Sequence, residues 1–325
     1  MRTPQTSAVG AVLTSLLVLA SCSTAGTTDT AQSAPITVDN CGDSVTFDTP
    51  PENVTVLRPA SIPTLSALGV LDRVTTRAGQ YPAEYYDDAT NEQLDAITSL
   101  TDKTDASGHL QISREEVVAA GADLVLGETD TVNRQTLASS DVPQLEEPAL
   151  CGDIDRPVTW DDIWDEIELY GTVFGREDAA ASTIEELQGR LEELTDTAGA
   201  GGVTIAALFP TLGGGVTYAY GSQSMATPLI ERTGATNIYG DQDERVFEVT
   251  AEDVVERNPD VILALYPGGE EQQFVDAVND LPGIGTTTAG REQNVLPLLL
   301  NFADPPTPLA LDGLEMLTTY LEGLT

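Results

Sequence analysis

The amino-acid sequence predicts an α/β protein with two lobes, each built on a parallel sheet, and a long α-helix that connects them. An internal repeat is the first observation: short helices begin after Ser113 and Thr250, and each leads through a turn to an apolar strand at 124–126 and 261–263. Strands that alternate with helices favour parallel sheets. A central segment with helical periodicity is the second observation. Together they indicate two Rossmann-like lobes joined by a long connecting α-helix.

The two repeats resemble each other at their helix starts. Ser113 with Glu116, and Thr250 with Asp253, have the spacing of capping boxes, the second with Asp in place of Glu. Each half also contains an earlier apolar strand, followed by a helix that closes on a glycine. These first strands are expected at 54–57 and 203–208.

The segment between the halves has a different character. Residues 159–174 and 177–198 carry helical periodicity, and in the second stretch leucines fall on one face while acids fill the other. A single stiff helix here would allow only a small hinge motion. The expected organisation is a signal peptide at 1–21, a flexible tether at 22–35, an N-terminal α/β lobe at 36–158, a connecting helical segment at 159–200 and a C-terminal α/β lobe at 201–325.

The N-terminus is typical of a bacterial lipoprotein signal. Arg2 is followed by an uncharged run at 8–20 that is too short to span a bilayer but suits a signal peptide. The run ends Leu19-Ala20-Ser21-Cys22, which resembles a lipobox, in which the Cys22 sulfur takes a diacylglyceryl group. An ordinary secretory signal, with Cys22 uninvolved, is the alternative. We therefore expect a lipid anchor at the extracellular face of the cell membrane.

The charge balance excludes some partners. The chain has 325 residues with 14 Lys+Arg against 53 Asp+Glu, a formal net charge of −39. Such a field repels nucleic acid and anionic lipid headgroups, so neither is an expected partner. Surface solvation, as in a salty habitat, explains the acidity, and recruitment of a cationic partner is the alternative. We expect a monomer, and no second apolar run is long enough to cross a membrane.

Two cysteines remain besides Cys22. An even pair in an oxidising compartment indicates a disulfide between Cys41 and Cys151. Two free thiols are the alternative. A metal site is disfavoured, because no other cysteine or histidine lies close in sequence to either residue.

The expected ligand site is the cleft between the lobes, because ligands of open α/β sheets bind beyond the carboxyl ends of the strands. Tyrosines and arginines follow several predicted strands. Aromatic faces pack on rings and the guanidinium fork meets carboxylate or catecholate oxygens, so this set suits a planar or anionic ligand. Core packing for each tyrosine and a surface ion pair for each arginine are the alternatives. The candidates are Arg58, Arg77, Tyr81, Arg134, Tyr218, Tyr220, Arg245 and Tyr266.

Enzyme motifs are lacking. His109 is the only histidine, and the sequence contains neither Gly-x-Ser-x-Gly nor His-Glu-x-x-His. We therefore predict a protein that is not an enzyme and needs no cofactor. One histidine also argues against a zinc or manganese receptor, which needs several imidazole or carboxylate ligands. His109 is expected in a loop, with contact to a ligand as the alternative.

Three sequence phrases in this order, behind a lipobox, resemble the class III substrate-binding proteins of ABC importers, a group that includes siderophore, haem and cobalamin receptors. The first phrase is a helix that closes on glycine and turns into a strand, and the second is the pair of repeats. The resemblance covers roughly residues 36–325, and its phrases are 64–74, the repeats around Glu115 and Glu252, and Gly221-Ser222 followed by 233–238.

The resemblance implies a receptor that delivers a small ligand to an ABC importer permease. It also implies that Glu115 and Glu252, one on each lobe, dock on permease arginines. Stabilisation of its own helix by a first-turn glutamate is the alternative role for each. A ferric siderophore is the favoured ligand. Haem, with a tyrosine or His109 on the iron, and cobalamin are alternatives from the same family, and an extracellular hydrolase is a less favoured alternative from another class.

Overall fold

The computed structural model describes residues 34–105, 109–152, 154–197, 199, 201–213 and 215–324. The predicted signal peptide, the predicted lipid-attachment residue Cys22 and nearly all of the predicted tether therefore lie outside the described residues. Within the described part of the chain, no helix combines the length and the apolar character that a membrane span requires.

The first sheet has five parallel strands in the order β5-β4-β3-β6-β7. The chain visits these positions in the order of a Rossmann-like half, so the direction of winding reverses between β3 and β6. Every residue of β3 and of β6 is buried, as expected for a parallel sheet covered on both faces. The strands are β3 (Val54–Val56), β4 (Val74–Ala78), β5 (Thr98–Thr101), β6 (Leu124–Leu126) and β7 (Gln144–Leu145).

Short helices connect these strands. They are α1 (Ile62–Ala67), α2 (Asp88–Ala96), α3 (Arg114–Ala119) and α4 (Arg134–Leu137). Each follows one strand and precedes the next, so the connections are crossovers between parallel strands. These elements, with the hairpin described next, are called the first lobe.

An antiparallel hairpin, β1 (Ile36–Asn40) with β2 (Asp43–Phe47), precedes the first sheet. Asn40 joins it to the end of β7: its side-chain amide donates to the Glu146 carbonyl at 2.8 Å and its amide oxygen accepts from the Glu146 N–H at 3.0 Å. The structure also links Cys41 to Cys151 by a disulfide, with the two Cα atoms 4.8 Å apart. The hairpin is thereby fixed to the first lobe both by hydrogen bonds and covalently.

The second sheet is mixed. β8 (Thr204–Pro210), β10 (Thr236–Asn237), β12 (Val261–Tyr266) and β13 (Val295–Leu299) run parallel, as the sequence predicted. β9 (Thr217–Tyr220) and β11 (Val246–Val249) are antiparallel additions at one side. The sequence predicted parallel sheets and did not anticipate these two strands. β8 and β9 are joined only by residues 211–216, and so short a connection produces an antiparallel hairpin.

The helices of this half are α7 (Ala226–Arg232), α8 (Ala251–Arg257), α9 (Glu271–Asn279), α10 (Thr288–Glu292) and α11 (Leu309–Glu322). Together with β8–β13 they are called the second lobe. The predicted two-lobe α/β architecture is confirmed.

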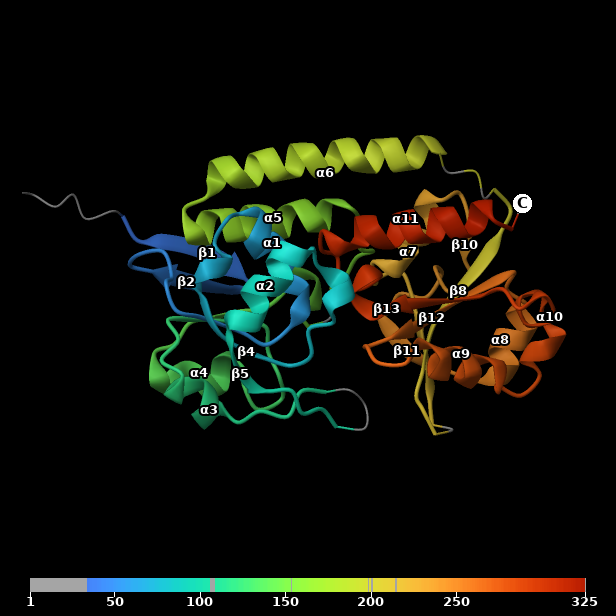
Figure 1. Cartoon of the computed structure of the whole chain (residues 1–325), viewed down its shortest axis with the longest axis horizontal. Coiled ribbons are helices and arrows are strands. Elements are labelled where there is room, and N and C mark those ends of the chain that lie inside the picture. The colour runs from blue at the N-terminus through green and yellow to red at the C-terminus, as the bar shows by residue number, and fades with distance from the viewer. Residues whose placement is uncertain are drawn as a thin grey trace, which may run out of the picture. The chain divides into compact units, whose positions relative to one another are not determined.

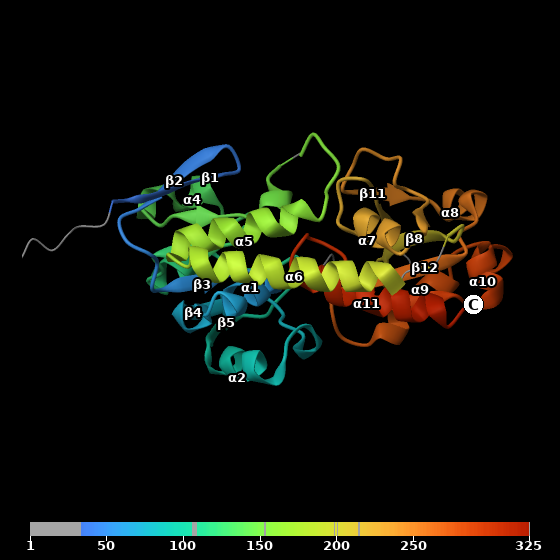
Figure 2. The same cartoon turned by 90° about the horizontal axis from the view of Figure 1, so that it is seen from above.

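Two helices form the connecting segment: α5 (Asp161–Phe174) and α6 (Glu177–Thr197). Gly171 of α5 allows them to pack closely, since a Cβ at this position would lie 2.6 Å from the Cβ of Ala180. Figures 1 and 2 both show α6 extending along α5 and then along α11. Arg190 of α6 pairs with Asp312 and Glu315 of α11, at 2.8 and 2.6 Å. The long connecting helix that the sequence predicts is therefore α6, which contacts both lobes.

Candidate functional site

A cavity of about 420 Å³ lies where the ends of β4, β5 and β12 come together. The first lobe contributes most of its wall and the second lobe contributes the glycine turn that follows β12. Carboxyl ends of strands are where open α/β sheets bind ligands. We call this cavity the inter-lobe pocket, and the residues used below are Arg77, Tyr81, Glu84, Asp102, Gly268 and Gly269.

Arg77 and Tyr81 pack against each other in the wall of the pocket. The guanidinium carbon of Arg77 lies 4.9 Å from the centroid of the Tyr81 ring, within the range of a cation–π contact. The Tyr81 hydroxyl lies 3.1 Å from the carbonyl oxygens of both Val56 and Ala78 and can donate to either. Burial raises the pKa of Tyr81 far above its ordinary value, and the positive charge of Arg77 opposes this only in part. Tyr81 is therefore a fixed, neutral ring with an arginine over it.

The turn after β12 approaches the first lobe closely. Gly268 has a φ of +141°, and a Cβ there would lie 3.3 Å from the Cγ atom of Pro82. A side chain at this position would therefore strain the backbone and press on the first lobe. Because Gly268 has no side chain, the turn after β12 can lie close to Pro82 of the first lobe at this edge of the pocket.

Arg58 lies at the switch point of the first sheet, directly after β3. It donates to the carbonyl of Glu128 at 3.0 Å, and its Nε atom is 3.6 Å from a carboxylate oxygen of Glu146. The side chain of Arg58 is 39% exposed, whereas that of Glu146 is 2% exposed. Gly127, with a φ of +87°, makes room, because a Cβ there would lie 3.2 Å from the Cγ atom of Arg58. The buried carboxylate of Glu146 therefore forms an ion pair with the half-exposed guanidinium of Arg58.

Arg245 repeats this arrangement on the second lobe. Its guanidinium pairs with Asp304; the two side chains are 38% and 3% exposed. Asp304 also accepts from the Ser224 hydroxyl at 2.8 Å. The Asp304 carboxylate raises the pKa of Arg245, and Glu146 of the first lobe adds to this rise. The two arginine–acid pairs, one from each lobe, therefore act on each other electrostatically.

Arg58 and Arg245 do not line the inter-lobe pocket, and neither do the remaining sequence candidates. Arg134 pairs with Asp43 at 2.7 Å and donates to the Asn40 side chain at 2.9 Å, so it fastens the β1–β2 hairpin. Tyr220 is buried in the core, where burial and then the Asp304 charge raise its pKa. Tyr266 is buried at the end of β12, with its ring centroid 5.6 Å from that of Phe274. Tyr218 is half-buried on β9.

His109 is also outside the pocket. Its side chain is largely exposed in the loop before α3, and its Nδ1 atom lies 3.6 Å from a carboxylate oxygen of Asp105. The structure therefore places the single histidine of this protein on the surface, where the sequence analysis expected a loop residue.

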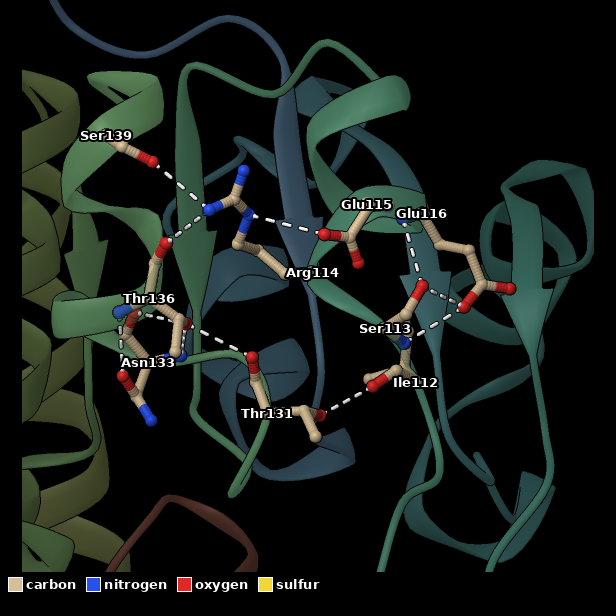
Figure 3. Close-up of polar contacts among 9 residues, drawn as sticks. All are labelled: Ile112, Ser113, Arg114, Glu115, Glu116, Thr131, Asn133, Thr136 and Ser139. Carbon is tan, nitrogen blue, oxygen red and sulfur yellow. Dashed lines mark hydrogen bonds and ion pairs between the residues drawn. The ribbon is translucent and has the colours of Figure 1, made fainter.

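The glutamate pair occupies equivalent positions on α3 and α8. On α3, the Ser113 hydroxyl accepts from the Glu116 N–H at 3.3 Å, and the Glu116 carboxylate accepts from the Ser113 N–H at 2.9 Å, so the predicted capping box is present (Figure 3). Glu115 is the second residue of this helix and its side chain is 79% exposed. Arg114 lies beside it, with Nε 3.9 Å from the Glu115 carboxylate, and donates to the Thr136 carbonyl and the Ser139 hydroxyl.

Glu252 is the second residue of α8 and is exposed. Thr250 caps this helix by accepting from the Asp253 N–H at 3.2 Å. The Asp253 carboxylate does not return to the N-cap but accepts from the Tyr239 hydroxyl at 2.8 Å. The reciprocal half of the predicted capping box is therefore missing on α8, where the shorter aspartate finds a nearer donor.

Comparison with known proteins identifies the chain. A family model described as "Periplasmic binding protein" matches residues 54–298. A solved structure described as an ABC-type Fe3+-hydroxamate transport system, from Saccharomonospora viridis, is 46% identical, with a TM-score of 0.85 and coverage of 88% of this chain and 99% of that one. The chain belongs to the periplasmic binding protein family. No curated protein matches it.

More distant structures agree with this periplasmic binding protein fold. A haem-binding protein from Roseiflexus sp. RS-1 is 18% identical, with a TM-score of 0.68 over 84% of this chain and 98% of that one. A vitamin B12 binding protein from Vibrio cholerae is 18% identical, with a TM-score of 0.60 over the same shares. The neighbours are class III periplasmic binding proteins, as the sequence phrases implied. The family consists of solute-binding proteins that work with ABC importers, and it is not a family of enzymes.

Sequence reasoning missed the buried acids of this binding protein. Glu147 is buried behind Glu146, and burial together with the neighbouring Glu146 charge raises its pKa to about 7. Burial and then the Glu147 charge raise the pKa of Glu166 on α5, against a hydrogen bond from the Thr64 hydroxyl at 2.8 Å. In so acidic a chain these glutamates look like surface residues. The position of Glu146 and Glu147 directly after β7 was the available signal, but a two-residue strand is too short to recognise.

Proposed function

We propose that this protein is a membrane-anchored receptor that binds a ferric siderophore of the hydroxamate class and delivers it to an ABC importer. The observation that carries the proposal is the 46% identity to the Fe3+-hydroxamate transport protein across 99% of that chain. The inter-lobe pocket supports it, because Arg77 and Tyr81 offer hydrogen-bond donors and a ring face. Hydroxamate oxygens are hydrogen-bond acceptors and suit a guanidinium.

Haem is a weaker candidate ligand. A tyrosine that binds haem iron does so as a phenolate, and the raised pKa of the buried Tyr81 opposes that form. His109 lies on the surface beside Asp105. Cobalamin would need mainly an aromatic-lined cleft, whereas Tyr220 and Tyr266 are buried in the core.

The proposed receptor is a monomer held at the extracellular face of the cell membrane by lipid on Cys22. Glu115 and Glu252 are its proposed contacts with permease arginines. Each glutamate is the second residue of its helix, and both are exposed. This symmetry supports the role, since a permease built from two similar subunits can contact one carboxylate with each subunit. A first-turn glutamate stabilises its helix, but that role alone does not require one on each lobe.

Binding measurements test the proposal. Isothermal titration with a ferric tris-hydroxamate, haemin and cobalamin should show tight binding of the hydroxamate complex only. Arg77→Ala should weaken that binding about tenfold by removing a charge-assisted hydrogen bond. Arg291→Ala is a matched control, because it removes one positive charge from the exposed surface of α10. Binding of haemin with a shifted Soret band, without binding of the hydroxamate complex, would refute the proposal.

A further inference from the structure

The charges at the inter-lobe pocket do not favour an anionic ligand. Among the residues that the structure describes, the pocket wall and the two arginine–acid pairs, which do not line the pocket, hold three guanidinium groups and four carboxylates. These groups sum to a net charge of minus one. The guanidiniums are Arg58, Arg77 and Arg245, and the carboxylates are Glu84, Asp102, Glu146 and Asp304.

Two of the three arginines are already neutralised within the protein. Glu146 holds Arg58 and Asp304 holds Arg245, and both acids are almost wholly buried, so neither can turn away into solvent. Each pair presents a half-exposed guanidinium that can still donate hydrogen bonds but brings no net positive charge. Burial raises the pKa of Glu146, and Arg58 opposes that rise. With Glu146 protonated, the seven groups would sum to zero, which is still not positive.

The third arginine shares the pocket wall with two acids. Arg77 lines the pocket together with Glu84 and Asp102, so the pocket wall itself carries more negative than positive charge. Lys103 follows Asp102 along the chain but does not line the pocket, and its charge acts on Glu116 of α3. The strongly negative protein as a whole adds to the field.

We infer that this pocket selects its iron complex by charge: it accepts complexes with zero or positive net charge and rejects polyanionic ones, with Glu84 and Asp102 as the specificity-determining residues. Three singly charged hydroxamates neutralise a ferric ion, whereas three doubly charged catecholates leave a trianion. The inference rests on the proposed function, and it narrows the ligand beyond the general class of ferric siderophores. It also replaces the expectation that the arginines serve as charge partners of an anionic ligand.

A series of ligands with one iron core and three charges tests this inference. A linear ferric tris-hydroxamate that ends in an ammonium is a cation, its N-acetylated form is neutral, and its N-succinylated form is an anion. Titration calorimetry should rank their affinities as cation, then neutral complex, then anion. Each added negative charge should weaken binding about fivefold to tenfold at low salt, and less at high salt.

Variants assign the effect to the pocket. Glu84→Gln with Asp102→Asn should reduce the spread of affinities across the series. Glu186→Gln with Glu193→Gln removes two charges from the exposed face of α6 and should leave the spread nearly unchanged. Equal affinity across the series, tighter binding of the anion, or equal binding of a ferric tris-catecholate would overturn the charge inference while leaving the receptor function standing. Failure to bind any member of the series would overturn the proposed function and this inference together.

Discussion

The backbone N–H of Asn301 in the second lobe donates a hydrogen bond to the phenolic oxygen of Tyr85 in the first lobe, at 3.0 Å. Both residues are buried. The Tyr85 ring also packs edge-on against Phe302, with centroids 5.0 Å apart. Tyr85 is therefore a contact between the two lobes.

Tyr85→Phe should lower the free energy of unfolding by about 1–3 kcal/mol, because the ring remains while a buried N–H loses its acceptor. Chemical denaturation followed by tryptophan fluorescence measures this change. Trp160 is well placed as a probe, since its indole N–H lies 3.4 Å from the carbonyl oxygen of Pro228 in α7. Tyr320→Phe is the control on α11, where the hydroxyl is only partly buried. An equal, small effect of both substitutions would contradict the role of Tyr85.

Much of the fold could be predicted from local pattern, and much of the site could not. Apolar strands, capping residues and helix periodicity are local signals, and they predicted β6, β12, α3, α8 and α6. The β1–β2 hairpin and the strand β7 are short, so periodicity had little length in which to appear. Partners far apart in sequence have no local signal at all, and Arg245 with Asp304, which are 59 residues apart, is an example.

The arginine candidates also have partners far apart in the sequence, which local pattern could not predict. Position after a predicted strand was the reason for choosing Arg58 and Arg77. In the structure Arg77 lies within β4 and lines the inter-lobe pocket, whereas Arg58 follows β3 and lies outside that lining. Position after a strand could not reveal that Glu146 would neutralise Arg58 or that Arg134 would hold Asp43, because both acids belong to segments more than eighty residues away along the chain. The sign of the local charge is set by such pairs, so ligand charge could be inferred only from the structure.

Glu147→Gln should stabilise the protein more at pH 8 than at pH 5. The pKa of Glu147 is raised by burial to about 7, so the folded state binds a proton that the unfolded state has already released between pH 4.5 and 7. Stability therefore falls as pH rises through this window, and glutamine removes the fall. The gain at pH 8 relative to pH 5 is on the order of 1–3 kcal/mol, measured by urea denaturation. Glu256→Gln on the exposed side of α8 is the control, and a pH-independent difference for Glu147→Gln would argue against this assignment.

Cys41 and Cys151 should be recovered as a linked peptide pair by mass spectrometry without reduction. The bond closes a separation of 110 residues. Chain-entropy models assign such a loop about 4–5 kcal/mol of stabilisation, so Cys41→Ser with Cys151→Ser should lower the melting temperature markedly. Arg134 and Asn40 still hold the hairpin in that variant, so the lobe should fold. Two thiols that react with an alkylating reagent in freshly purified protein would disprove the pairing.

Cys22→Ser should release the protein from the membrane fraction or leave its precursor uncleaved, because serine cannot receive the thioether-linked lipid. Fractionation followed by immunoblotting measures both outcomes. Ligand binding by the purified protein should be unchanged, since the inter-lobe pocket is built entirely from residues at positions 77–269. Unaltered processing together with unaltered membrane retention would show that Cys22 carries no anchor.

Charge reversal at Glu115 and Glu252 should separate docking from ligand binding. Glu115→Lys with Glu252→Lys should abolish uptake of the iron complex by cells, because like charges would then face the permease arginines. Affinity for the ligand should change less than about twofold, since neither residue lines the inter-lobe pocket. Glu185→Lys with Glu192→Lys on the exposed side of α6 makes the same change in net charge and should leave uptake intact. Loss of ligand affinity in the double variant, or normal uptake, would refute the docking role.

The single variants should differ from each other. The Nε atom of Arg114 lies 3.9 Å from a carboxylate oxygen of Glu115, so Arg114 already offsets part of the Glu115 charge. Glu252→Lys should therefore reduce uptake more than Glu115→Lys.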